Sequence, residues 1–175
     1  SHNSYLFKGT VAENLRMGKP DASAGEMREV LAKVNLWGFL EQQQGLETLV
    51  MEKGANLSGR QCQRMAIARA LLHDTPVYIF DEATSNIDAE SEEMIMDVIH
   101  DLAKTKTILL ISHRLANVVN SDRIYMMKDG AVAETGTHET LMSGGGAYAG
   151  LYRSQMELEE YGRTGVKGGR KEAAV

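Results

Sequence analysis

The pattern of apolar and polar positions predicts an α/β chain built around two short strands. Val77–Phe80 and Thr107–Ile111 are continuous apolar runs, rich in β-branched or aromatic residues, which is typical of strands buried on both faces. Residues 89–103 lie between them, and their apolar positions recur at the spacing of an amphipathic helix. A strand, a helix and a second strand in succession predict a βαβ unit with parallel strands.

Helical patterns precede this unit and a hairpin pattern follows it. Ser23 and Glu26 have the spacing of a capping box, and an apolar stripe of helical period comes directly after them. A second capping box, Ser58 with Gln61, predicts a long helix over residues 61–72. Further along, Asp129-Gly130 separates two short strand-like runs and predicts a β-hairpin.

Two adjacent carboxylates, Asp81 and Glu82, follow the first predicted strand. Because a carboxylate loses hydration at the end of a buried strand, it needs a partner there, and a hydrated divalent cation is a common one. Successive strand residues point to opposite faces, so we interpret Asp81 as a Mg²⁺ ligand and Glu82 as the group that polarises an attacking water. The alternative is an acidic turn that opens the next helix, where negative charge is favourable.

Polar residues also mark two further places where a ligand would bind. The helix that begins near Ser58–Gln61 presents free N–H groups and a positive dipole end, and Gly59 allows close approach to its backbone. A well-capped helix without a ligand explains the same residues. His113 follows the second strand, at the sheet edge that would also carry Asp81 and Glu82, so it is interpreted either as functional or as a hydrogen-bonded structural residue.

Composition, net charge and the cysteine count exclude several classes of protein. The 175 residues are 43% hydrophobic and 25% charged, as in an ordinary globular domain. A net charge of −5 argues against a nucleic-acid partner. The single cysteine, Cys62, excludes an internal disulfide and a cysteine-rich zinc site. Cys62 has no base spaced to activate it, and we interpret it as a bystander.

Taken in order, several segments resemble the motifs of one family. The matching segments are Leu57–Gln61, similar to the ABC signature; Val77–Glu82, similar to the Walker B strand; Ser85–Asp88, similar to the D-loop; His113, similar to the switch histidine; and Asp122–Ile124, Asp129-Gly130 and Glu134–Glu139, similar to the closing segment. Over residues 4–156 the chain resembles the C-terminal portion of an ABC transporter nucleotide-binding domain of the exporter type.

The resemblance implies a fold and a domain plan. The expected fold is a partial P-loop NTPase (RecA-like) parallel sheet, with a helical signature subdomain and a C-terminal β-hairpin plus helices. Residues 1–161 would form a truncated ATP-binding domain, divided into a helical signature part at 11–72 and, at 73–161, a Walker B and switch-histidine core with the C-terminal helices. Residues 162–175, which are rich in glycine and charge, are expected to be a disordered tail.

The resemblance also implies roles within a head-to-tail sandwich of two such domains around two ATP molecules. Asp81 would help to hold Mg²⁺, and Glu82 would be the general base. His113 would contact the γ-phosphate and couple to the opposing D-loop, which includes Asp88. In the same scheme, three residues would bind the γ-phosphate of ATP held by the other protomer: Ser58, Gly59 and Gln61.

Three features depart from the family pattern. The chain contains no Gly-x-x-x-x-Gly-Lys-Ser/Thr phosphate loop, and truncation is the simplest interpretation. His2 aligns with the Q-loop glutamine, and a histidine there can still coordinate or hydrogen-bond a ligand. Arg60 stands where the signature has its second glycine, adding favourable charge near a phosphate but also bulk. We therefore expect a weakened signature site.

The implied parent protein is an ABC transporter that uses ATP hydrolysis to power export. Its partners would be a membrane domain and a second nucleotide-binding domain, identical or different, at the cytoplasmic face of the inner membrane. The fragment alone would be inactive, and its sheet would expose an unpaired edge and an uncovered apolar face. The alternatives are a non-hydrolysing regulatory or dimerisation module and a soluble ABC ATPase of the DNA-repair kind.

Overall fold

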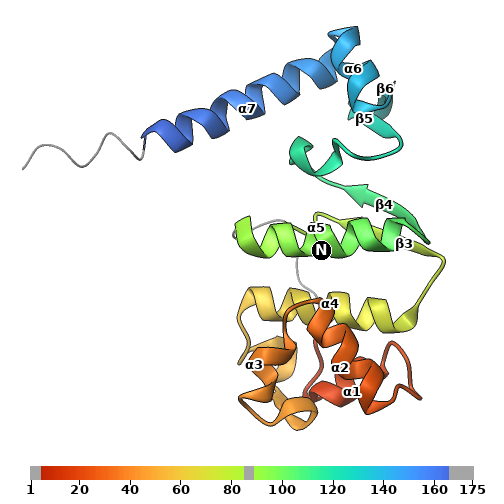
Figure 1. The fold of residues 1–175 in the computed structure, drawn as a ribbon, viewed down its shortest axis with the longest axis vertical. Coiled ribbons are helices and arrows are strands. Elements are labelled where there is room, and N and C mark those ends of the chain that lie inside the picture. The colour runs from red at the N-terminus through yellow and green to blue at the C-terminus, as the bar shows by residue number, and fades with distance from the viewer. Residues whose placement is uncertain (1–4, 85–88, 166–175) are drawn as a thin grey trace, which may run out of the picture. The chain divides into compact units, whose positions relative to one another are not determined.

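The computed structural model describes residues 5–84 and 89–165 of the chain (Figure 1). His2 and Asp88, both expected to bind nucleotide, lie outside the described residues. The chain divides into two compact units, residues 1–111 and residues 112–175. The expected helical segment 11–72 falls wholly within the first unit, together with both central strands.

The first unit begins with a helical part that has its own apolar core. Leu15, Leu31 and Leu40 are completely buried in it, and Met65 joins them from the longest helix of this part. The elements are β1 (Gly9–Thr10), α1 (Val11–Arg16), α2 (Ala24–Lys33), α3 (Trp37–Glu41), η1 (Gly45–Glu47), β2 (Leu49–Val50), η2 (Glu52–Gly54) and α4 (Gly59–His73). The α4 helix includes all of the predicted segment 61–72 and is longer by two residues at its start and one at its end.

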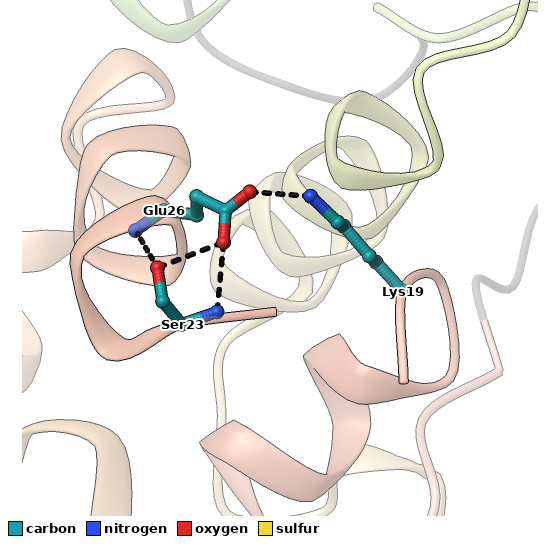
Figure 2. A network of polar contacts seen from close by, with 3 residues as sticks. All are labelled: Lys19, Ser23 and Glu26. Carbon is teal, nitrogen blue, oxygen red and sulfur yellow. Dashed lines mark hydrogen bonds and ion pairs between the residues drawn. The ribbon is translucent and has the colours of Figure 1, made fainter. Parts of the chain in front are cut away.

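Local side-chain contacts fix where these helices begin. The capping box expected at the start of α2 is confirmed: the Glu26 N–H donates to Ser23 Oγ, and the Ser23 N–H donates to Glu26 Oε2 at 2.8 Å. Figure 2 shows that Lys19 Nζ also donates to the Glu26 carboxylate, from the turn before the helix. Together, these three hydrogen bonds at an exposed corner of the chain stabilise the N-terminus of α2.

The central sheet of this unit consists of β3 (Val77–Asp81) and β4 (Thr107–Ile111), connected through α5 (Ala89–Ala103). The two strands are parallel and in register from Val77 opposite Thr107 to Asp81 opposite Ile111, which confirms the predicted βαβ unit. Neither strand pairs with a third strand in the part of the chain that the structure describes. An unpaired sheet edge was expected, and it is present.

The expectation that β3 is buried on both faces is wrong. Tyr78 and Phe80 are buried and share a core with α5, but Val77 and Ile79 on the opposite face are 50% and 66% exposed. On β4, Leu109 and Ile111 are exposed as well. A continuous apolar run means that both faces of the strand are able to be buried. In this structure, the described residues cover only one of the two faces. The uncovered apolar face expected from the sequence is therefore confirmed.

The second unit is a hairpin with three helical segments. Its elements are η3 (Leu115–Val118), β5 (Ile124–Lys128), β6 (Ala131–Gly136), α6 (His138–Gly144) and α7 (Ala147–Gly165). The predicted hairpin is confirmed, because β5 and β6 are antiparallel and Asp129 and Gly130 both have positive φ. The α7 helix extends to Gly165, so the first four residues of the expected tail are helical. No helix among the described residues is long and apolar enough to span a membrane.

Candidate functional site

The candidate site begins at the carboxyl end of β3. Asp81 is the last residue of the strand and is exposed, and the half-buried Glu82 follows it. The Glu82 N–H donates to the Ile111 carbonyl at 2.9 Å, which continues the β3–β4 pairing by one residue. Glu82 nevertheless has a φ of 48°, in the left-handed region that non-glycine residues rarely adopt. Its backbone is thus held in a strained conformation at the sheet edge, as is common at functional sites.

A side chain from α4 also holds the turn after β3. Gln63 Nε2 donates a hydrogen bond to the carbonyl of Ala83, and Thr84 behind it is buried. Gln63 lies one turn into the helix whose start is the second part of the candidate site. No local sequence pattern marks Gln63, because its partner lies twenty positions away in the chain.

The second part of the site is the N-terminus of α4. Ser58 caps the helix, with its Oγ accepting from the Gln61 N–H, while Gln61 Oε1 accepts from the Ser58 N–H at 2.8 Å. Ser58, Gly59 and Arg60 are all exposed. A Cβ added to Gly59 would meet no atom within 4 Å, so the space directly beside this residue is open. An exposed helix N-terminus is a place where an anion is able to bind, and the role of this one stays a prediction.

The loop that leads into α4 is fixed by its own hydrogen bonds. Asn56 Oδ1 accepts from the Met51 N–H and Asn56 Nδ2 donates to the Leu49 carbonyl, both at 2.8 Å. Gly54 has a φ of 70°, and a Cβ there would lie 2.6 Å from the Cys62 sulfur. Burial raises the pKa of the Cys62 thiol, which agrees with its interpretation as a bystander, since only a thiolate is a strong nucleophile.

The third predicted residue, His113, is exposed and belongs to the second unit. It lies in a turn that Ser112 closes, because the Ser112 Oγ accepts from the Arg114 N–H at 3.0 Å and donates to the Arg114 carbonyl at 3.1 Å. A residue of α7, Gln155, contacts the backbone of the same turn. The convergence of His113 with Asp81 and Glu82 in one cleft stays a prediction.

The residues present fit the expected ligands. No group of three or more His, Cys, Asp or Glu side chains suited to a metal ion occurs among the described residues. Magnesium is commonly held by one or two carboxylates together with substrate phosphates, and the exposed Asp81 at the strand end is a carboxylate of this kind. The open α4 N-terminus suits a phosphate group.

Comparisons with known proteins show what the chain is similar to. The family model described as "ABC transporter" matches residues 1–85. The chain is 51% identical over 91% of its length to an uncharacterized ABC transporter ATP-binding protein of Haemophilus influenzae. It is 46% identical over 90% of its length to ATP-dependent lipid A-core flippase 1 of Colwellia psychrerythraea. A solved structure, that of a bacterial Atm1-family ABC exporter with ATP bound, matches 87% of the chain with a TM-score of 0.81 and 35% identity.

The fold is thus that of an α/β chain with a partial P-loop NTPase architecture. In sequence and structure it is similar to the nucleotide-binding segment of ABC transporters, and the solved structure that it matches is an exporter. The chain spans 29% of the Haemophilus protein, 26% of the flippase and 27% of the exporter structure.

Proposed function

We propose that this chain is part of the ATP-hydrolysing domain of an ABC exporter and that it supplies residues to both sides of a shared nucleotide. ATP and Mg²⁺ are the proposed ligands. The Haemophilus relative is named an ATP-binding protein, the Colwellia relative is named an ATP-dependent flippase, and the solved exporter structure has ATP bound. A second nucleotide-binding domain and a membrane domain are the proposed partners, at the cytoplasmic face of the membrane.

The backbone of Glu82 is the observation that carries the proposal. A left-handed conformation costs a non-glycine residue roughly 1–2 kcal/mol, and a glycine at this position would avoid that cost. The conformation is held by the Ile111 carbonyl, which accepts from the Glu82 N–H, and by Gln63, which binds the next carbonyl along the chain. A strained acid held at the carboxyl end of a parallel strand is well suited to act as a general base.

The neighbouring residues have complementary proposed roles. Asp81 helps to hold magnesium, which neutralises phosphate charge when bound. Glu82 orients a water molecule and accepts its proton as the oxygen attacks the γ-phosphorus, while ADP leaves with the electrons of the broken bond. His113 contacts the γ-phosphate, and Asp88 and His2 complete the nucleotide contacts.

The α4 N-terminus is proposed to act on the nucleotide held by the other domain. Gly59 leaves room for a phosphate to approach the helix backbone, and the capping box between Ser58 and Gln61 keeps the first turn formed before a ligand arrives. Arg60 adds a positive charge in the same turn. Because these groups are positioned in advance, little conformational entropy is lost when the phosphate binds.

The test is ATP hydrolysis by the full-length protein that we propose contains this chain. Glu82→Gln keeps the size of the side chain but removes the base, so we expect the hydrolysis rate to fall roughly a hundredfold to ten-thousandfold. Glu41→Gln is the matched control, because Glu41 is an exposed acid at the end of α3. A wild-type protein that binds ATP but does not hydrolyse it would instead support a non-hydrolysing regulatory module, which Arg60 in the signature favours.

A further inference from the structure

The backbone of the His113 turn is held on both sides by one side chain from a distant helix. Gln155 Nε2 on α7 donates to the His113 carbonyl at 2.6 Å. The Oε1 atom of the same amide accepts from the Leu115 N–H at 2.9 Å. The two backbone groups lie 42 and 40 positions away from Gln155 in the sequence, and together the two bonds form what we call the Gln155 clamp.

Only an amide side chain of this length satisfies both backbone groups. The His113 carbonyl needs a donor and the Leu115 N–H needs an acceptor, and Gln offers one of each at adjacent atoms. A carboxylate at the same place would accept from Leu115 but would face the His113 carbonyl with a second acceptor. The pairing also fixes the orientation of the amide, because the flipped amide would place like groups together.

Further contacts hold the same turn. Glu159, one helical turn beyond Gln155 on α7, lies 4.0 Å from the Arg114 guanidinium. Inside the turn, the Ser112 hydroxyl bonds both backbone groups of Arg114. The side chain of Leu115 is buried, which anchors the far end of the turn. The Cα atom of His113 is thus fixed between two held backbone segments, while its imidazole is exposed.

We propose that Gln155 is a positioning residue for His113, holding the backbone on both sides of the histidine so that its imidazole meets the γ-phosphate in the orientation that hydrolysis requires. This inference rests on the proposed function of His113. Loss of the clamp would leave the histidine present but less well oriented, and misplacement of a catalytic group by about 1 Å costs up to roughly a hundredfold in rate.

The first experiment compares Gln155→Met with Glu157→Met in the full-length protein. Met matches the length of Gln but makes neither hydrogen bond, and Glu157 is an exposed residue on the same helix. We expect Gln155→Met to lower kcat for ATP roughly tenfold, with KM changed less than about twofold, and Glu157→Met to leave both unchanged. Amide hydrogen exchange without nucleotide should show faster exchange at Leu115 and unchanged exchange at Leu141, whose N–H bonds the Thr137 carbonyl.

A double-mutant cycle separates positioning from a general structural role. In a His113→Ala background, Gln155→Met should lower the residual rate no further, because there is no imidazole left to position. A further tenfold loss of rate from Gln155→Met in the His113→Ala background would overturn the inference. It would also be overturned if the wild type were active and Gln155→Met had the same kcat as the Glu157→Met control. A wild-type protein with no ATPase activity would refute the proposed function itself, and the inference with it.

Discussion

The helical part of the first unit and its central sheet differ in how much of their apolar surface they bury. In the helical part, Leu15, Leu31 and Leu40 have no exposed surface, and capping boxes fix the starts of α1, α2 and α4. In the sheet, β3 alternates between buried and exposed residues, and Ile79 is 66% exposed. The helical part is therefore specified by its own sequence, whereas the sheet has only one face covered by the described chain.

The largest expected difference between the two regions is in their response to loss of an apolar side chain. Leu31→Ala leaves a cavity in a closed core and should lower the free energy of unfolding by about 2–5 kcal/mol. Ile79→Ala removes a side chain that is mostly in water already, so the change should be within about 0.5 kcal/mol. Urea unfolding of the chain measures both, and equal losses would contradict the distinction.

The exposed sheet face also predicts that the 175-residue chain is poorly stable or self-associates in solution. Placing a charge on that face by Ile79→Lys should reduce the association, because burying an unpaired ammonium against a second copy is costly. Lys substitution at the exposed Glu41 serves as the control. Sedimentation velocity at several concentrations gives the result, and a monomeric wild-type chain that melts cooperatively would disprove this prediction.

Arg60 tests the helical side of the proposed nucleotide site. Its side chain occupies the first turn of α4, where the neighbouring Gly59 leaves open space. Arg60→Gly removes bulk near the backbone, so the full-length protein should hydrolyse ATP faster, by roughly two- to tenfold. Steady-state ATPase assays measure this rate. An unchanged or slower rate in Arg60→Gly would contradict the prediction that Arg60 weakens the signature site.

Glu82 tests the sheet side of the site through its strained backbone. Glu82→Gly should raise the free energy of unfolding by up to about 1 kcal/mol, because glycine adopts a φ of 48° without strain, and it should also abolish ATP hydrolysis. Asn35→Gly, at a φ of 50° away from the proposed site, should affect stability alone. Loss of stability in Glu82→Gly would show that the side chain has a structural role instead.

The smallest expected effect concerns the corner that holds α2. Hydrogen bonds from Lys19 and then from Ser23 lower the pKa of Glu26 from 4.5 to about 2. Because the folded-state pKa is depressed, the stabilisation is fully present above pH 4.5 and is lost as the pH falls toward 2. Glu26→Gln should lower Tm by a few degrees at pH 7, and its difference from wild type should shrink below pH 4.5. If the Tm difference between Glu26→Gln and wild type did not vary with pH, the charge of Glu26 would not be the cause of the stabilisation.

Much of the fold and part of the site follow from local patterns. The capping box at Ser58, the hairpin at Asp129-Gly130 and the strand that ends at Asp81 each depend on residues close together in the sequence, and the structure confirms all three. The sequence pattern does not predict the left-handed backbone of Glu82, because non-glycine residues rarely adopt it and tertiary contacts impose it.

The remaining features depend on contacts between distant residues. Gln63 reaches Ala83 and Gln155 reaches the His113 turn, and neither glutamine belongs to a local motif that marks its partner. The apolar pattern of β3 does not predict the exposure of Ile79 either, because an apolar run shows which surfaces are able to be buried and not what covers them.

The central claim is that Glu82 acts on an ATP molecule bound at the end of β3. The most direct test is to incubate the full-length wild-type protein and Glu82→Gln with labelled ATP and Mg²⁺, and to identify the nucleotide that stays bound. We predict ADP on the wild type and intact ATP on Glu82→Gln, with similar total binding. ADP on both proteins, formed at the same rate, would contradict the claim.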